Sequence, residues 1–333
     1  MGQRANLVIV DGDRRELHYD HWCANRLDDE LFWGPELAIE FIRQREPVAE
    51  PEGWLDTIWC EGAAIVDVGR SVLTWFGGED VLYDVPQRRA HLELMAHQWP
   101  GWDIRWAHEG ILSIADELGL PRAEFRGRPR DADAQSTRPR LARNDEFPDF
   151  NQVATSVRLE DGELLVARLC GTTDALHAGP ALLEPLLAHG SRDPLRWNPF
   201  PWGGVHVDRG QRTIDVWWAG TTYDLVDHMR AAWPGWTVGW HRDRYERQVE
   251  LADGRIVLPA PGNPHRSVLE FLASQVFHEA RNPAAEIAPL LASQGHNVDY
   301  INPATAISRG SAGDPDHKRA ILAALARSLT STA

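Results

Sequence analysis

Cysteine and long apolar runs are scarce in this sequence of 333 residues. Its three cysteines, Cys23, Cys60 and Cys170, are too few for a disulfide framework, and none belongs to a CxxC pair of the kind that binds zinc. No apolar run approaches the length of about 18 residues that spans a bilayer, and charged residues follow the N-terminus too early for a signal peptide. We therefore expect a soluble, cytoplasmic protein with no membrane partner.

The motifs of the common enzyme classes are missing as well. The sequence has no Walker loop, GxGxxG fingerprint, GxSxG elbow or HExxH helix. Enzymes that carry such signatures therefore have no support, and we expect no cofactor.

Positive charge is in short supply, since 34 basic residues face 49 acidic ones and the net charge is −15. This balance argues against a nucleic-acid partner, which needs an excess of positive charge on one face. Lys318 is the only lysine, a bias that we attribute to a GC-rich genome. The arginine-rich stretch 122–143 is a local exception. The acidic remainder would favour solubility and could steer a basic partner toward the protein.

Internal similarity is the strongest pattern in the sequence. The tetrapeptide WPGW at 99–102 recurs at 233–236. Further matches keep the same order along the chain: Val66-Asp67 with Trp75 and Val207-Asp208 with Trp217, Tyr83-Asp84 and Tyr223-Asp224, Gly34-Pro35 and Gly179-Pro180. Because the order of the matches is kept, they indicate a duplicated structural unit of more than 90 residues.

Each copy is predicted to contain two ββα pieces. Alternating apolar residues flank an Asp-Gly turn in VRLEDGELLV from Val157, a typical hairpin signal. A helix that starts at a proline follows, and a second hairpin and helix lead to WPGW. We expect an α+β fold of internally repeated ββα-type units, with antiparallel sheets covered by helices on one face.

The expected organisation has four parts. Copy one covers residues 1–121, an exposed Arg/Pro-rich linker covers 122–148, and copy two covers 149–247. Residues 248–333 are interpreted as a degenerate third copy with an inserted helix, because VELADGRIVL from Val249 repeats the hairpin pattern.

Tryptophans that recur at matching positions are expected to fill the core, because a packed indole buries roughly 200 Å². Trp22, Trp33 and Trp54 have no counterpart in copy two, so they are candidates for a binding surface. Arg89 and Arg230 lie at equivalent places on the second helix of each copy and could bind an anion, although salt bridges are the simpler interpretation.

The densest group of reactive side chains is His18, Asp20 and His21. On a strand, His18 and Asp20 would share one face and His21 the other. Copy two has the apolar sequence LVARLC at the matching strand, so copy one is polar where copy two is not. A His/Asp pair could act as a general base with its orienting carboxylate, or bind a metal. The alternative is an ordinary polar edge strand.

A second His-x-Asp pair occurs at His206 and Asp208, and His265 follows downstream. Two histidines and one carboxylate form the facial triad of non-haem iron enzymes, so these three are weak metal-site candidates. Copy one keeps Asp67 but has Ile65 in place of the histidine, which favours a turn role for Asp208.

Two functions from different classes follow. The first is a non-catalytic interaction protein that binds a basic protein partner, as an immunity, antitoxin-like or regulatory factor would. The alternative is an enzyme, a hydrolase or metal-dependent, with His18, Asp20 and His21 as its catalytic residues. A small-molecule ligand on exposed aromatic side chains is a third option.

Overall fold

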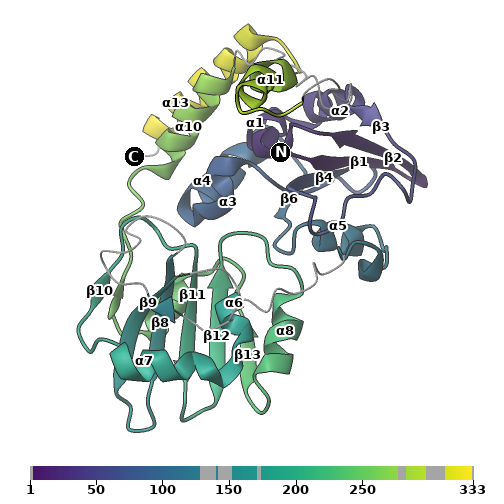
Figure 1. The fold of residues 1–333 in the computed structure, drawn as a ribbon. Helices are drawn as coiled ribbons and strands as arrows, with labels where there is room; N and C mark the ends of the chain where they lie inside the picture. The colour runs from purple at the N-terminus through teal and green to yellow at the C-terminus, as the bar shows by residue number, and fades with distance from the viewer. Residues whose placement is uncertain are drawn as a thin grey trace. The chain divides into compact units, whose positions relative to one another are not determined.

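The structure is a computed structural model that describes residues 3–127, 140–141, 152–170, 174–276, 283–297 and 312–331. The chain divides into two compact units (Figure 1). Unit 1 combines Met1–Leu82, Pro86–Gly127 and Gly262–Ala333, and unit 2 combines Tyr83–Val85 with Arg128–Pro261. Each unit contains a six-stranded sheet with its own helices, so the molecule is a mixed α+β protein.

Unit 1 is built on a sheet with the strand order β3-β2-β1-β4-β5-β6. Its strands are β1 (Ala5–Asp11), β2 (Arg14–Asp20), β3 (Glu46–Pro47), β4 (Gly62–Asp67), β5 (Val72–Phe76) and β6 (Asp103–Trp106). The associated helices are η1 (Ala24–Arg26), α1 (Leu27–Glu30), α2 (Pro35–Arg43), α3 (Glu79–Tyr83), α4 (Val85–Ala96), α5 (Ile111–Glu117), η2 (Arg122–Glu124), α10 (Pro264–Gln275), α11 (Pro283–Ser293) and α13 (Pro315–Ser331).

Helix α2 shows how the sequence specifies these elements. Gly34 precedes it with a φ of 101°, and Pro35 occupies the first turn, where a missing N–H has no consequence. Ala38, Phe41 and Ile42 follow at helical spacing and are buried. The helix expected to start at Gly34-Pro35 is therefore present.

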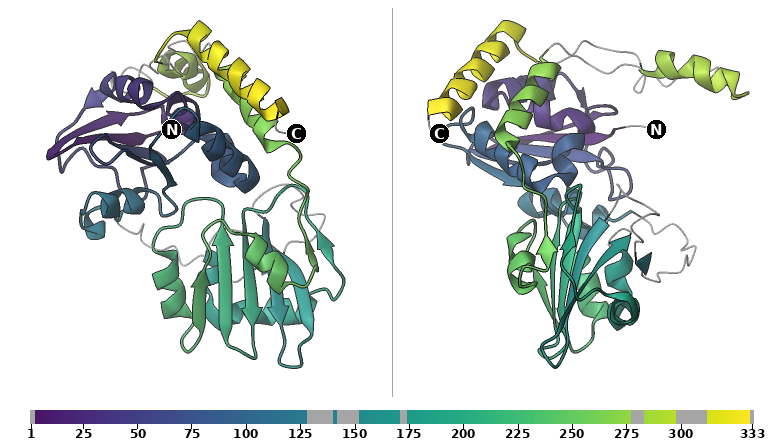
Figure 2. Two further views of the ribbon diagram at one scale, coloured as in Figure 1. Left: turned by 180° about the vertical axis from the view of Figure 1, so that it is seen from behind. Right: turned by 90° about the vertical axis from the view of Figure 1, so that its left-hand side faces the viewer.

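The C-terminal helices return to unit 1. Figure 2 shows α10 in green and α13 in yellow lying side by side in both views. Val268 and Leu272 of α10 and Leu322 and Leu325 of α13 are buried. The last part of the chain therefore completes the hydrophobic core of the unit that the first part begins.

Unit 2 has the strand order β13-β12-β11-β8-β9-β7 and a separate two-stranded sheet, β10-β14. Its strands are β7 (Arg140–Leu141), β8 (Gln152–Arg158), β9 (Leu164–Cys170), β10 (Leu195–Arg196), β11 (Gly203–Asp208), β12 (Thr213–Trp218), β13 (Thr237–Trp240) and β14 (Ile256–Val257). Its helices are α6 (Asp174–His177), η3 (Gly179–Leu182), α7 (Leu183–His189), α8 (Leu225–Ala232) and α9 (Glu246–Leu251).

Both sheets are mixed, and the expectation of antiparallel sheets is wrong. The hairpins β1-β2 and β4-β5 are antiparallel, as their turns predict, but β1 pairs with β4 in parallel. Unit 2 repeats this arrangement, with β8 and β11 as the parallel pair between two hairpins. A helical connection carries the chain across the sheet between the hairpins, so the second hairpin starts in the same direction as the first.

Helices cover both faces of the unit 2 sheet rather than one. Val205 and Val207 of β11 belong to the core that also contains Leu186 of α7 and Met229 of α8. On the opposite face, Gln248 of α9 donates hydrogen bonds to backbone oxygens of the central strands. All six residues of β11 are buried as a result.

The two WPGW segments have the same local structure. Trp99 and Trp233 are each 1% exposed or less, and each indole N–H donates a 2.9 Å hydrogen bond to a backbone oxygen, that of Leu31 and Leu176 respectively. The glycine of each segment has a φ close to 80°, and its two tryptophan rings meet edge to face. These tryptophans are core residues, as expected from their recurrence.

One matched pair of tryptophans is not equivalent. Ala64 of β4 lies opposite Trp75, whereas the corresponding Val205 of β11 lies opposite Val216. Trp217 therefore occupies the position of Phe76 and faces the other side of its sheet. Trp217 lies one residue farther from Val207 than Trp75 does from Val66, and a displacement of one residue on a strand reverses the face.

The third copy is not formed as a hairpin. The segment from Val249 ends helix α9 and continues through an Asp-Gly turn into β14, which pairs in parallel with β10. Of the expected linker 122–148, Arg122–Glu124 forms η2 and Phe125 is buried, so its beginning belongs to unit 1. Apart from β7, the linker beyond residue 127 lies outside the described residues.

Candidate functional site

His18 and Asp20 lie on one face of β2, as expected, but they serve a buried arginine. Nδ1 of His18 lies 3.3 Å from the backbone oxygen of Arg45, and Oδ2 of Asp20 lies 3.6 Å from Nε of Arg45. The guanidinium of Arg45 lies 3.9 Å from the centre of the Phe41 ring. All three polar side chains are buried. The pair therefore holds the end of α2 against the sheet.

His21 is directed elsewhere. Its Nδ1 lies 2.7 Å from the Tyr19 hydroxyl, and its ring meets the half-buried Trp22 edge to face at 4.8 Å. Burial raises the pKa of the Tyr19 hydroxyl. The contacts of His21 with Tyr19 and Trp22 are thus different from those that His18 and Asp20 make with Arg45, as expected from the opposite faces of the strand.

The aromatic and arginine candidates are dispersed. Trp33 is buried at 5% exposure, and Trp54 is half-buried with its ring 5.1 Å from that of Phe125. Arg230 forms an ion pair of 3.4 Å with Asp227 on the same helix. Arg89 is a half-buried residue of α4, in the other compact unit.

The metal candidates also serve other purposes. Asp208 accepts a hydrogen bond from the backbone N–H of Gln211, as Asp67 does from Arg70, so both are turn residues. His265 belongs to unit 1, where its Nε2 lies 2.8 Å from a carboxylate oxygen of Glu93. Within the described part of the chain, no group of three or more His, Cys, Asp or Glu residues could hold a metal ion.

His206 instead belongs to a row of polar side chains across unit 2. The strand register places Ser156 of β8 and Asp215 of β12 on either side of it. Oγ of Ser156 lies 2.8 Å from Nδ1 of His206, and Asp215 accepts a 2.6 Å contact from Nε2 of His241. We call these four residues the Ser156 row. A Cβ on Gly239 would lie 2.6 Å from the Asp215 carboxylate, so this glycine makes room for His241.

The chemistry of the Ser156 row is limited by burial. Burial lowers the pKa of His206 to about 4, against the opposing influence of Asp215, so the ring is neutral at pH 7. A neutral histidine beside a serine hydroxyl is the arrangement of a nucleophile and its base. However, Ser156 is 0% exposed and His206 is 1% exposed. The row therefore consists of two separate polar pairs, of which the Ser156–His206 pair is buried and does not offer its hydroxyl to a substrate.

Sequence comparison of the two copies identified only one member of this row. Matching the sheets strand by strand places Val8, Ile65, Thr74 and Ala107 of unit 1 at the positions of Ser156, His206, Asp215 and His241. The exchange of Ile65 for His206 was visible in the sequence. The other three required the cross-strand register, which the sequence does not contain.

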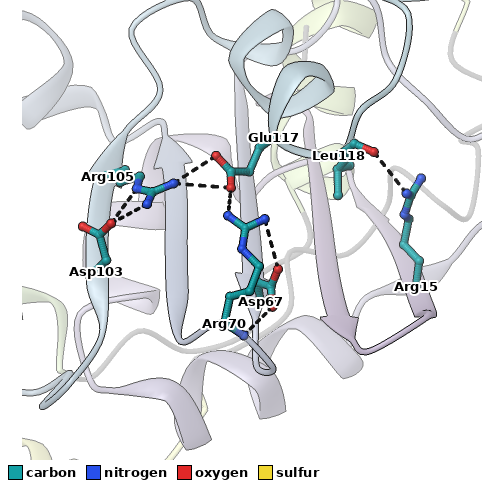
Figure 3. Close-up of polar contacts among 7 residues, drawn as sticks. All are labelled: Arg15, Asp67, Arg70, Asp103, Arg105, Glu117 and Leu118. Carbon is teal, nitrogen blue, oxygen red and sulfur yellow. Dashed lines mark hydrogen bonds and ion pairs between the residues drawn. The ribbon is translucent and has the colours of Figure 1, made fainter.

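Unit 1 has an ion-pair network at the end of its equivalent row (Figure 3). Arg105 of β6 lies next to Thr74 in the register and pairs with Asp103 and with Glu117 at the end of α5. Glu117 also accepts a hydrogen bond from Arg70, which pairs with Asp67. This network fastens α5 to the turns of the sheet.

The residues that sequence analysis missed most clearly are Ile58 and Trp59. They are 42% and 46% exposed, on the loop of residues 54–61 that connects β3 to β4. We call this segment the Trp59 loop. The sequence analysis singles out Trp22, Trp33 and Trp54 but not Trp59, because no signal in the sequence sets Trp59 apart.

The Trp59 loop is held by hydrogen bonds at several points. Asp56 accepts hydrogen bonds from the backbone N–H groups of Ile58 and Trp59. The backbone N–H of Thr57 donates to the backbone oxygen of Phe125 at 2.8 Å. The Arg4 guanidinium lies 4.5 Å from the centre of the Trp59 ring. The exposed side chains are therefore presented by an ordered backbone.

Comparisons with known proteins add no identity to these observations. No protein-family model, curated protein or solved structure matches this chain. Among the helices that the structure describes, none combines the length and apolar character needed to cross a lipid bilayer.

Proposed function

We propose that this protein acts by binding a basic protein partner through the Trp59 loop. The observation that carries the proposal is the exposure of two adjacent large apolar side chains, Ile58 and Trp59, on a loop with a fixed backbone. Tryptophan is enriched among the residues that dominate binding energy at protein interfaces.

Preorganisation strengthens this interpretation. A loop that is already ordered loses little conformational freedom when it binds, so more of the contact energy appears as affinity. The hydrogen bonds that Asp56 and the backbone oxygen of Phe125 accept fix the backbone on both sides of Ile58. The loop therefore resembles a prepared contact surface more than a mobile connection.

Charge indicates the kind of partner. The chain carries a net charge of −15. At the loop itself, Asp56 and Glu61 are acidic, and Arg4 lies 3.9 Å from the Glu61 carboxylate. A basic protein would be attracted to this region by long-range electrostatics and held by the apolar contact.

Sequestration of such a partner in the cytoplasm, as an immunity, antitoxin-like or regulatory protein would do, remains the functional class that we favour. The enzymatic alternative at His18 and Asp20 has less support, because both side chains are buried and contact Arg45. We also propose that the two sheets derive from one duplicated module, because five strands of each sheet share the same order and the WPGW segments share their geometry.

The test compares partner capture by wild type, Trp59→Ala and Leu187→Ala, the last being a control at a 39% exposed leucine of unit 2. Wild type and the control should recover the same basic protein in stoichiometric amount. With the purified partner, Trp59→Ala should weaken affinity by at least about tenfold. Higher salt should weaken binding of all three proteins.

Two results would refute the proposal. One is equal affinity of wild type and Trp59→Ala for the captured partner. The other is the absence of any stoichiometric partner in extracts of the native host. Far-UV circular dichroism of each variant distinguishes loss of binding from loss of folding.

A further inference from the structure

The only lysine of the chain is buried. Lys318 lies in α13 and is 1% exposed, with its ammonium nitrogen 4.9 Å from the centre of the Trp33 ring. Among the described residues, Nζ of Lys318 has no hydrogen-bond partner. A buried amine without such a partner is costly, so its presence calls for an explanation beyond helix packing.

A second incompletely bonded group lies near this amine. Asp29 of α1 is 1% exposed, and its Oδ1 accepts a 3.1 Å hydrogen bond from the indole N–H of Trp33. Its Oδ2 has no hydrogen-bond partner within the part of the chain that the structure describes. The Trp33 indole therefore contacts the amine through its face and the carboxyl group through its edge.

The electrostatics of Asp29 suit proton transfer near neutral pH. Burial, with a contribution from Glu30, raises the pKa of Asp29 to about 7, although Lys318, Arg26 and the hydrogen bond from Trp33 act in the opposite direction. A carboxyl group with a pKa near the working pH can both accept and return a proton.

We propose that Lys318 is a reactive amine that condenses with a small aldehyde or ketone, with Asp29 as the group that moves the proton. Buried lysines beside apolar walls serve this purpose elsewhere in protein chemistry. Trp33, one of the three unmatched tryptophans, would form the wall of the site. This activity is independent of the Trp59 loop.

The reaction balances with these two groups. A water molecule that enters when the start of α13 opens relays a proton from the ammonium to Asp29. The neutral amine then attacks the carbonyl carbon, and a proton moves from the nitrogen to the oxygen to give the carbinolamine. Asp29 then returns the proton to the hydroxyl, which leaves as water while the nitrogen lone pair forms the C=N bond. The products are the protonated imine and one water molecule, and no oxidant or reductant is consumed.

A carbonyl compound can reach the buried amine of Lys318 because the amine lies close to a helix end. Lys318 lies one turn from the start of α13 at Pro315, and helix ends open locally at low free energy. A small carbonyl compound needs only such an opening to reach the amine.

Reductive trapping tests the proposal on the full chain. The protein is incubated with acetaldehyde and cyanoborohydride at pH 7, and the modified amines are located by peptide mass mapping. Lys318 and the amino terminus are the only primary amines, so the terminus is an internal reference. In an unfolded chain the terminus should react first, because an α-amine is more often neutral at pH 7 than an ordinary lysine.

The expected result is that Lys318 reacts faster than the terminus in the native chain and slower in urea. Asp29→Asn keeps the acceptor for Trp33 but cannot move the proton, so it should slow labelling of Lys318 at least about tenfold without affecting the terminus. Protection of Lys318 in the native chain, or equal labelling of wild type and Asp29→Asn, would overturn the proposal. Lys318→Arg confirms the assignment of the modified peptide.

Discussion

Burial keeps His206 neutral, and this has a consequence for stability. Its pKa is lowered from 6.5 to about 4 by removal from water, with Asp215 and Asp208 opposing and Arg158 and Arg247 adding to the shift. The unfolded chain therefore binds a proton more readily than the folded chain. The contribution of His206 to the free energy of unfolding is therefore fully present above about pH 6.5 and is lost as the pH falls toward 4.

We predict that His206→Asn reduces the acid sensitivity of folding. Asparagine can still accept a hydrogen bond from Ser156 but does not titrate. Wild type should lose about 3 kcal/mol through His206 between pH 7 and pH 4, and the variant should not. Urea unfolding at several pH values measures the difference.

His97, which is exposed and directly follows α4, provides the control. His97→Asn should show the same dependence of the unfolding free energy on pH as wild type. His91, whose pKa burial also lowers to about 4, leaves a residual pH dependence in every variant. If the unfolding free energy of His206→Asn depended on pH as strongly as that of wild type, His206 would not be a source of the acid sensitivity.

The residue scale is also where sequence reasoning was weakest. His18 and Asp20 were correctly placed on one face of a strand. Their shared partner Arg45 could not be predicted, because it lies just after the end of helix α2, far from them in the sequence. The exposure of Trp59 and the burial of Trp33 likewise depend on tertiary packing. The sequence identifies the reactive side chains, but tertiary packing determines which of them lie close together.

At the scale of elements, local patterns were more informative. The hairpins and the proline-started helix α2 follow from turn residues and apolar spacing, which act over a few neighbours. Parallel pairing of the hairpins is a long-range property and was missed. The Asp-Gly pair at Asp253 does form a turn, with positive φ at both residues. However, residues with positive φ end helices as well as connect strands, and this turn follows helix α9 rather than a strand.

The network at the end of α5 allows a test at this scale. Glu117→Gln should lower the melting temperature at low salt, because Glu117 pairs with Arg70 in the β4-β5 turn and with Arg105 on β6 (Figure 3). The difference from wild type should shrink in 1 M salt, where the Debye length is only about 3 Å. Differential scanning calorimetry at two salt concentrations measures both effects.

Glu270→Gln is the matched control, since Glu270 forms a single exposed ion pair with Arg266 on one helix. It should leave the melting temperature unchanged at either salt concentration. A salt-independent loss in Glu117→Gln would mean that the residue acts through packing instead.

At the scale of the whole molecule, unit 2 is almost continuous in sequence and unit 1 is not. Residues 128–261 contain all of the unit 2 sheet, whereas unit 1 needs Gly262–Ala333 in addition to the N-terminal part. We predict that fragment 128–261 folds alone and that fragment 1–127 does not, because it lacks α10 and α13.

Near-ultraviolet circular dichroism during heating is the measurement. A cooperative transition is expected for 128–261 and none for 1–127, and adding residues 262–333 in trans should restore one to the latter. A cooperative transition of 1–127 by itself, at the temperature of the full chain, would show that the C-terminal helices contribute little to unit 1.

Because unit 1 combines segments before and after unit 2 in the chain, its folding during synthesis on the ribosome is also affected. The ribosome synthesises the N-terminal sheet of unit 1 before unit 2, and the helix that carries Lys318 after unit 2. Asp29 and Trp33 therefore lack their packing partner while all of unit 2 is synthesised. A premature stop codon that removes α13 would damage a part of unit 1 that was made before unit 2.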